Sequence, residues 1–309
     1  MRPRGGRARR TYIRPVGFTL PDDTAIVADG GLATELEARG HDLSDPLWSA
    51  RLLVDDPQEI VAVHESFFRA GAMIATTASY QASFDAFAAR GVSRDQTTRI
   101  LRRSVELASD ARAEVGVTGA WIAASVGPYG AALADGSEYR GRYGLRVAQL
   151  EAWHRPRLEV LADAGADVLA LETIPDADEA EALVNVVRSL GVPAWLSYTI
   201  DGMRTRAGQP LADAFAVAAG VPEIVAVGVN CCAPTDVLAA IESAAATGKP
   251  VIAYPNSGES WNPARRTWDG RSRFSHSLAT RWVSAGARVV GGCCRVRPAD
   301  IAKLSAALA

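Results

Sequence analysis

Lysine is nearly absent from this 309-residue chain, and cysteine and long apolar runs are also scarce. Only two of the 33 basic residues are lysines, Lys249 and Lys303, and the formal net charge is −2. A nearly neutral chain is not expected to bind nucleic acids or membranes in general. No stretch reaches the roughly 18 uninterrupted apolar residues of a membrane helix, and no apolar segment near the N-terminus marks a secretory signal. We therefore expect a soluble, cytoplasmic protein.

The four cysteines form two adjacent pairs, in GVNCC at 228–232 and in VVGGCC at 289–294. In a reducing compartment, clustered cysteines indicate a metal site or catalysis more than a disulfide. The chain has no CxxC spacing, which disfavours an iron–sulfur cluster and a redox disulfide. His64-Glu65 is not followed by the second histidine of HExxH, so a metalloprotease helix is excluded.

The first 16 residues differ in composition from the rest of the chain. Residues 1–16 carry six arginines and no acidic residue, and they show no hydrophobic periodicity. A basic arm for nucleic acid is one interpretation, but a lone basic run is weak support for it. We favour a disordered leader or an over-called start site, followed by one domain over residues 17–309.

Short apolar runs recur along the remainder of the chain, and most of them follow a glycine. Three of these glycines lie in the tripeptide Ala-Gly-Ala, at 70–72, 164–166 and 285–287. Glycine just past a helix end supplies the left-handed residue that stops the helix, so each run is predicted to be a buried strand that follows a helix. With AIVADGG at 25–31 the runs number eight. The glycines that precede the other seven are Gly71, Gly119, Gly165, Gly191, Gly220, Gly248 and Gly286.

The segments between the runs show helical periodicity. Residues 57–70, for example, place Ile60, Val63 and Phe67 on one face. Similar segments are 94–114, 145–164, 178–190, 234–246 and 298–308. Apolar strands separated by helices indicate a parallel sheet covered on both faces, and eight such units predict a single-domain α/β fold, the (β/α)8 TIM barrel. A doubly wound open sheet fits less well, because no GxGxxG follows the first run.

Polar residues concentrate at the carboxyl ends of the predicted strands, whereas the interiors are almost wholly Val, Ile, Leu and Ala. Chemistry in a barrel of this kind takes place at these ends. The strand-end residues are Asp29, Thr76, Thr77, Ser125, Glu172, Thr173, Tyr198, Asn230, Cys231, Asn256, Cys293 and Cys294. The sixth and eighth strands are near neighbours around the ring, so their cysteines are predicted to meet at one rim.

Two to four thiols at one rim make a soft site, suited to zinc, copper(I) or an iron–sulfur cluster. Three protein ligands and an open fourth position are typical of catalytic zinc. Consecutive strand residues point to opposite faces, so Cys293 and Cys294 reach one ion only if the chain leaves strand geometry there. Gly291 and Gly292 are expected to give the backbone that freedom.

The GVNCC pair raises the same geometric objection, and we expect only one of its thiols to bind. Cys231 lies closer to the strand and is the predicted ligand, whereas Cys232 is expected to pack as a small buried hydrophobe. The alternative is that all four cysteines are inert core residues, as free cysteine often is. Two pairs at two strand ends favour the metal.

Six motifs, in order and at the expected strand ends, make this chain resemble the homocysteine S-methyltransferase family from about residue 25 onward. They are DGGLATELEARG (29–40), TTASYQAS (76–83), ETIPDADEA (172–180), GVNCCAP (228–234), YPNSGE (254–259) and GGCC (291–294). The match is to the short, single-barrel members that use S-methylmethionine or S-adenosylmethionine as methyl donor. Betaine-dependent members usually carry extra C-terminal segments, and cobalamin-dependent methionine synthases add whole domains.

The resemblance implies a zinc-dependent methyltransferase that converts homocysteine to methionine. It implies a Zn2+ site of Cys231, Cys293 and Cys294, with the sulfur of homocysteine in the fourth position. The amino-acid end of homocysteine would then lie near Asp29, Gly30, Gly31, Thr76 and Glu172. Glu172 would otherwise need an arginine partner, because a buried unpaired carboxylate is costly.

The methyl donor is expected to be a sulfonium cation, so its binding calls for aromatic faces. Trp48 and Tyr80 are the candidates for cation–π contact, with packing as the alternative role. The donor itself is not predicted, although the loops at 131–146 and 259–274 are where its contacts are expected. Rival functions are methyl transfer to selenocysteine or another small thiol, betaine-dependent transfer, and a non-catalytic zinc barrel that senses a thiol amino acid.

Overall fold

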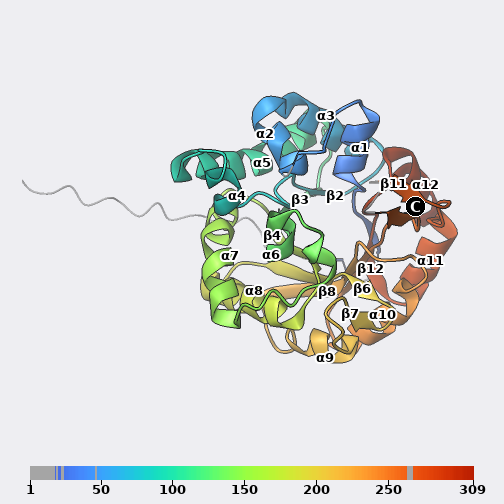
Figure 1. Ribbon diagram of the computed structural model, residues 1–309. Helices are drawn as coiled ribbons and strands as arrows, with labels where there is room; N and C mark the ends of the chain where they lie inside the picture. Colours follow the sequence, from blue (N-terminus) through green and yellow to red (C-terminus); the bar gives the residue numbers. More distant parts are fainter. Residues whose placement is uncertain (1–17, 19, 22–23, 46, 263–266) are drawn as a thin grey trace, which may run out of the picture.

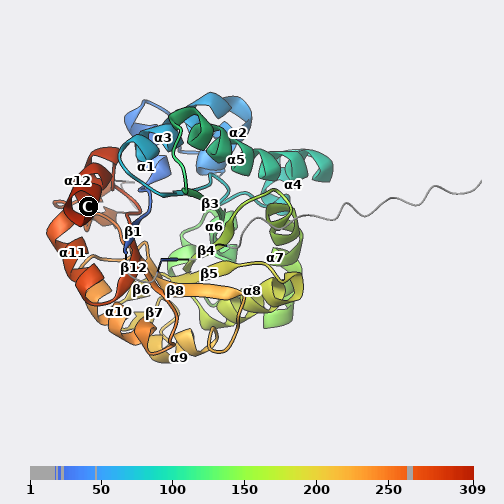
Figure 2. The ribbon, with the colours of Figure 1, turned by 180° about the vertical axis from the view of Figure 1, so that it is seen from behind.

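The computed structural model describes residues 18, 20–21, 24–45, 47–262 and 267–309. The expected leader at residues 1–16 lies outside this part of the chain, as do residues 263–266 of the second predicted donor loop. Figures 1 and 2 show a ring of helices around a central set of strands. None of the described helices combines the length and apolarity needed to cross a bilayer.

Eight parallel strands form the wall of a (β/α)8 barrel, as the sequence predicts. They are β1 (Ile26–Val27), β2 (Ile74–Thr76), β3 (Trp121–Val126), β4 (Val168–Ile174), β5 (Ala194–Tyr198), β8 (Ile224–Asn230), β9 (Val251–Tyr254) and β12 (Ala287–Val290). Their order is β1-β12-β9-β8-β5-β4-β3-β2. A parallel bridge between Ala28 and Ile74 joins β1 to β2 and completes the ring.

The six predicted helices are present within a few residues of their expected ends. They are α3 (Pro57–Arg69), α5 (Arg94–Val115), α7 (Val147–Ala162), α8 (Ala177–Leu190), α10 (Val237–Ala245) and α12 (Pro298–Leu308). Further short helices were not predicted: α1 (Leu32–Ala38), α2 (Leu52–Asp55), α4 (Phe84–Ala88), α6 (Tyr129–Leu133), α9 (Leu211–Ala216) and α11 (His276–Ser284), with the 3-10 turns η1 (Trp48–Arg51) and η2 (Ser137–Tyr139).

The glycines that precede the strands have the expected conformation. All seven have φ between 62° and 113°, the left-handed region. At the C-cap of α8, Gly191 donates its N–H to the carbonyls of Val187 and Arg188 and so ends the helix before β5. The glycine before each barrel strand after β1 therefore has the left-handed conformation, although α5 is ended by Gly116 and not by Gly119.

The core has two layers because successive strand residues point to opposite faces. On β4, Leu169 and Leu171 belong to the layer between the strands and the helices, whereas Ala170 belongs to the barrel interior. Phe18 packs edge-on against Trp121, the first residue of β3, at 5.3 Å between ring centroids. The amino-terminal end of the barrel is thus filled by side chains, and the carboxyl-terminal end is the open one.

Two antiparallel hairpins are inserted after barrel strands. β6 (Ile200–Asp201) pairs with β7 (Arg204–Thr205) after β5, and β10 (Ser260–Asn262) pairs with β11 (Thr267–Asp269) after β9. Both follow the carboxyl end of a strand, where barrel loops carry function.

Candidate active site

A cavity of about 670 Å³ opens at the carboxyl ends of the barrel strands. Ten residues were predicted to serve the site, and every one of them lines this cavity. They are Asp29, Gly30, Gly31, Trp48, Thr76, Tyr80, Glu172, Cys231, Cys293 and Cys294. The tertiary structure therefore brings together residues from the carboxyl ends of five strands and from neighbouring loops, while their individual roles remain predictions.

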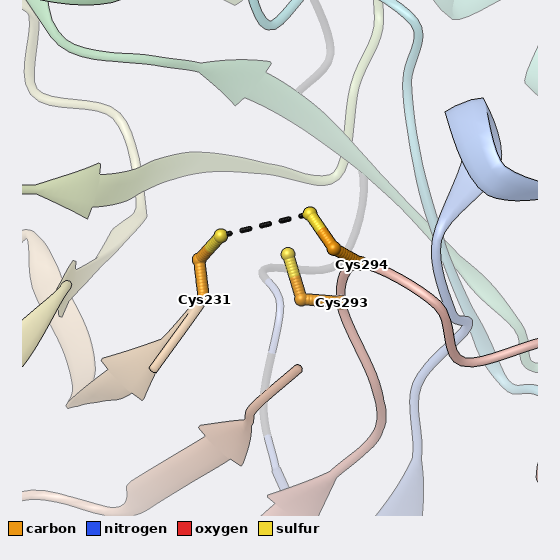
Figure 3. A group of neighbouring side chains, drawn as sticks. All are labelled: Cys231, Cys293 and Cys294. Atoms are coloured by element: carbon orange, nitrogen blue, oxygen red, sulfur yellow. Dashed lines mark hydrogen bonds between the residues drawn. The ribbon is translucent and has the colours of Figure 1, made fainter. Parts of the chain in front are cut away.

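Three of the four cysteines form a compact cluster at the rim. The Sγ atoms of Cys231, Cys293 and Cys294 all lie within 4.8 Å of one another, and Figure 3 shows them converging on one point. The Sγ atoms of Cys231 and Cys294 are 3.8 Å apart. Two sulfurs bound to one tetrahedral zinc at about 2.3 Å each would be about 3.8 Å apart. The three thiols therefore fit zinc in their chemistry, and the Cys231–Cys294 pair also fits it in spacing.

The two cysteines of GVNCC point in different directions. Cys231 follows the last residue of β8 and has φ of +50°, so the chain leaves strand geometry at this residue. Cys232 is 1% exposed and belongs to the hydrophobic core. Burial raises the pKa of the Cys232 thiol, which keeps it protonated and neutral. Only Cys231 of this pair thus reaches the cluster.

The glycines of GGCC play a different part from the one expected. Neither Gly291 nor Gly292 has positive φ, so backbone freedom is not what they supply. A Cβ on Gly292 would lie 2.2 Å from Cγ1 of Val296, and one on Gly291 would lie 2.8 Å from the carbonyl oxygen of Asp29. Both positions require glycine because neighbouring segments approach too closely for any side chain.

Backbone hydrogen bonds hold the two consecutive thiols after β12 has ended. The N–H of Cys293 donates to the carbonyl of Pro255 at 2.8 Å, and the N–H of Cys294 donates to Oδ1 of Asn256 at 3.2 Å. The N–H of Ser257 in turn donates to the carbonyl of Cys294 at 3.0 Å. The YPNSGE loop after β9 therefore acts as the support of the GGCC segment.

The thiols of the cluster have unequal pKa values. Hydrogen bonds from Cys293 and Cys294 lower the pKa of the Cys231 thiol, whereas the same contacts raise the pKa of both donors. Three adjacent thiolates would repel one another, so one thiolate with two thiol donors is the stable arrangement without a cation. Full deprotonation of the cluster requires a bound cation.

A carboxylate and a threonine meet at the ends of β1 and β2. Asp29 accepts hydrogen bonds from the N–H of Thr76 at 2.7 Å and from its hydroxyl at 3.0 Å. Burial nevertheless raises the pKa of Asp29 to about 8. A cationic ligand group would favour the ionised form.

Glu172 lies at the end of β4, and Ser125 donates a hydrogen bond to its Oε1. Burial raises the pKa of Glu172 to about 7. In the described part of the chain no arginine or lysine forms an ion pair with it, although an arginine partner was the alternative to a substrate ammonium.

Asn230, a predicted strand-end residue, has a structural task beneath the cavity. Its Oδ1 accepts from the N–H of Thr173 at 2.7 Å and from the hydroxyl of Ser197 at 2.8 Å, and its Nδ2 donates to the Thr173 hydroxyl at 2.7 Å. Thr173 has φ of +59°, which is costly for a β-branched residue. The amide of Asn230 thus stabilises the backbone distortion beside Glu172.

Trp48 and Tyr80 form an aromatic corner of the cavity. Their ring centroids are 6.2 Å apart and their planes meet at 68°. Both rings line the cavity, as the predicted cation contact requires, and each also packs edge-on against the other.

Comparison with known proteins agrees with the geometry. A family model described as homocysteine S-methyltransferase matches residues 26–308. The chain belongs to the homocysteine S-methyltransferase family. It is 46% identical over 303 residues to the homocysteine S-methyltransferase of Escherichia coli, covering 94% of this chain and 98% of that protein. It is 40% identical over 298 residues to the selenocysteine Se-methyltransferase of Brassica oleracea var. italica, covering 89% and 86%.

A crystal structure of the homocysteine methyltransferase MmuM from Escherichia coli, in its metallated form, is similar throughout. The TM-score is 0.82 at 45% sequence identity, and the match covers 92% of this chain and 96% of that one. The family is one of methyltransferases, and the barrel is its fold.

Sequence reasoning missed several residues of this site. Glu138 and Tyr139, in η2, line the cavity, and the hydroxyl of Tyr139 lies 3.2 Å from Sγ of Cys231. Tyr254, the last residue of β9, lines it too. For Glu138 and Tyr139 the only signal was position, since η2 lies within the loop at 131–146 where donor contacts were expected. Tyr254 begins the YPNSGE motif, which was recognised without a site role for this residue.

A buried polar network lies behind this loop. His154, in α7, is fully buried, and its Nε2 lies 2.8 Å from Oε1 of Glu179. Nη2 of Arg157 lies 2.9 Å from Nδ1 of His154 and also donates to the carbonyl of Gly127. Because an arginine always donates, His154 accepts at Nδ1 and donates from Nε2 to Glu179. Glu179 also accepts the N–H of Tyr129, so the network secures the start of the loop that carries η2.

Proposed function

We propose that this protein transfers a methyl group from a sulfonium donor, S-methylmethionine or S-adenosylmethionine, to the thiol of homocysteine, giving methionine, with zinc as cofactor. The observation that carries the proposal is the cluster of three Sγ atoms within 4.8 Å of one another at the rim of the cavity. The relative from Escherichia coli, crystallised in a metallated form, supports a metal at this kind of site.

Cys231, Cys293 and Cys294 would hold the ion. When bound, zinc supplies a Lewis acid that favours the thiolate form of a substrate thiol at neutral pH. Three thiolates already neutralise the charge of zinc and leave a net −1, so a substrate sulfur there keeps its electron density. No general base from the protein is then needed for the thiol proton, which passes to solvent.

The acidic side chains of the cavity suit the amino-acid end of homocysteine. Asp29 and Glu172 have pKa values raised by burial to about 8 and about 7, so each is costly to ionise alone. A substrate ammonium beside them would restore the ionised carboxylates. The aromatic rings of Trp48 and Tyr80 line the cavity and suit the sulfonium.

Methyl transfer between the two sulfurs is a balanced displacement. A lone pair of the homocysteine sulfur forms the new S–CH3 bond, and the S–CH3 bond of the donor breaks with its electron pair returning to the donor sulfur. The sulfonium becomes a neutral thioether, and no other reactant is consumed. Little new charge develops, so the protein contributes mainly by positioning the sulfurs and excluding water.

Selenocysteine is the second candidate acceptor, because the Brassica oleracea relative carries that activity in its name and is 40% identical. Selenium and sulfur share the soft-ligand chemistry that a thiolate-bound metal accepts. The non-catalytic zinc barrel remains the alternative outside enzymes. A structural zinc is normally closed by a fourth protein ligand, and the cluster holds three cysteines facing an open cavity.

The test is an assay of methionine formation from homocysteine with S-methylmethionine, S-adenosylmethionine and betaine in parallel, with selenocysteine as a competing acceptor. We expect turnover with at least one sulfonium and none after zinc is removed, with recovery on adding zinc back. If protein shown to contain zinc forms no product with any donor, the proposed methyltransferase activity is refuted and the non-catalytic thiol sensor is favoured. Faster methylation of selenocysteine than of homocysteine would reassign the acceptor.

A further inference from the structure

The cavity is strongly acidic. Among the described residues, no lysine, arginine or histidine lines it. Six acidic residues do: Asp29, Glu37, Asp45, Asp135, Glu138 and Glu172. A concave site lined by one sign of charge concentrates ligands of the opposite sign. The cavity as a whole therefore favours positively charged small molecules.

Most of these carboxylates already have protein partners. Asp45 pairs with Arg90, and Asp135 accepts the N–H of Ser137 at 2.9 Å. The carboxylates of Asp29 and Glu172 accept the hydrogen bonds described above, at the floor of the cavity.

Glu138 is different from the other acids. Its Oε2 is buried and has no hydrogen-bond partner, and no arginine or lysine of the described chain forms an ion pair with it. Burial raises the pKa of Glu138 to about 7. A buried carboxylate oxygen without a partner is costly in the free protein, which indicates that the partner of Oε2 arrives with a ligand.

The backbone, and not the side chain, holds Glu138 in this place. Gly130 of α6 approaches so closely that a Cβ there would lie 2.5 Å from the N atom of Glu138. The carbonyl of Ser137 accepts the N–H groups of Arg140 at 3.0 Å and Gly141 at 2.9 Å. The turn is therefore built before any ligand binds, and the carboxylate is left free to contact one.

Glu138 lies in the same 3-10 turn as Tyr139, which contacts the cysteine cluster, and this position points to one part of the ligand. The two reacting sulfurs must approach to about 3–3.5 Å, so the sulfonium has to lie beside the cluster. Tyr139, next to Glu138 in η2, reaches Sγ of Cys231 at 3.2 Å. The carboxylates of Asp29 and Glu172, at the floor of the cavity, then remain available to the ammonium group of homocysteine.

We propose that Glu138 binds the cationic centre of the methyl donor and selects positively charged donors over neutral analogues. This inference rests on the proposed function and adds to it a donor-specificity residue. Glu138 faces a charge that disappears as the methyl group moves. It therefore stabilises the bound donor more than the transition state, and removing it weakens donor binding without slowing the chemical step.

The test compares Glu138→Gln with the unchanged zinc-loaded protein. Two ligands are used: S-methylmethionine and 2-amino-5-methylhexanoic acid, which replaces the sulfonium by a neutral CH of the same shape. Loss of the carboxylate should raise the KM for S-methylmethionine about tenfold or more, with kcat unchanged or higher, because an ion pair at close range is lost. The inhibition constant of the neutral isostere should not change. The KM of Glu138→Asp for S-methylmethionine should fall between those of the unchanged protein and of Glu138→Gln. As a control, Glu114→Gln, which changes an exposed acid on α5, should behave as the unchanged protein.

Calorimetry keeps this inference separate from the proposed function. The preference of the unchanged protein for S-methylmethionine over the isostere should be measurable without turnover and should shrink at least tenfold in Glu138→Gln. An unaltered preference, or equal weakening of both ligands, overturns the role of Glu138 even if methionine is formed normally. If the protein prefers S-methylmethionine over the isostere, and this preference depends on Glu138, but no methionine is formed, the proposed reaction is overturned instead.

Discussion

Replacing Cys231 and Cys232 separately by alanine should give opposite results although the two residues are adjacent. The Sγ of Cys231 lies 3.8 Å from that of Cys294 and within the three-sulfur cluster. Cys232 is 1% exposed in the hydrophobic core. We expect Cys231→Ala to lose zinc and keep most of its stability, and Cys232→Ala to keep zinc and lose some stability.

The size of each effect follows from the surroundings of the two thiols. Zinc held by four ligands contributes about 10–16 kcal/mol, so one thiolate accounts for about 3 kcal/mol, and its loss should weaken zinc binding about 100-fold or more. Removing the buried sulfur of Cys232 leaves a small cavity and should lower the free energy of unfolding by about 1–2 kcal/mol. It should leave the affinity for zinc within a factor of about two, since Cys232 does not belong to the cluster.

The assay pairs zinc competition against a chromogenic chelator with urea denaturation of the metal-free proteins. The metal-free state matters because bound zinc would itself stabilise the fold and mask the cavity. If Cys231→Ala retained one zinc per chain with the affinity of the unchanged protein, the ligand assignment would be wrong. Equal loss of zinc in the two variants would show that the cluster is not formed as described.

Three further outcomes are expected. Burial raises the pKa of Asp29 from 3.8 to about 8, so its protonated form adds stability that is lost as pH rises through that window. In Asp29→Asn the fall in unfolding free energy from pH 5 to pH 8 should be shallower by up to about 1.4 kcal/mol per pH unit, and a pH-independent difference in urea denaturation would contradict this. Gly292→Ala should lower the free energy of unfolding by about 1–3 kcal/mol and weaken zinc binding, because its Cβ would lie 2.2 Å from Val296. Unchanged thermal stability and zinc affinity would contradict the close approach. Asn230→Ala leaves the N–H of Thr173 unpaired, so it should lower the free energy of unfolding by about 2–3 kcal/mol. It should also raise the KM for homocysteine. A change in stability without a change in KM would show that Asn230 serves only the fold.

Local chemistry explains why much of this molecule was predictable. Each of the seven glycines before a strand has positive φ, a conformation that depends on the residue and its immediate neighbours. The apolar runs and the helical periods depend equally on local sequence, so their number and order already implied the barrel. Parallel strands then align their carboxyl ends, which is why Cys231 and Cys293 were expected at one rim.

Other features depend on segments far apart in the sequence. Gly291 and Gly292 resemble flexible hinges when read alone, yet they are glycines because Asp29 and Val296 leave no space. His154 looks like one more helix residue until Glu179 of α8 is brought to it. Such contacts join elements that no local pattern links.

The sequence by itself determined the eight-unit repeat, the rim at which polar residues gather and the thiols that meet there, because these follow from backbone preferences and strand direction. Only the tertiary structure decided that Asn230 supports the backbone of Thr173 and that Glu138 reaches the cavity with one oxygen unpaired. These depend on how closely distant segments pack, and packing is a property of the whole fold.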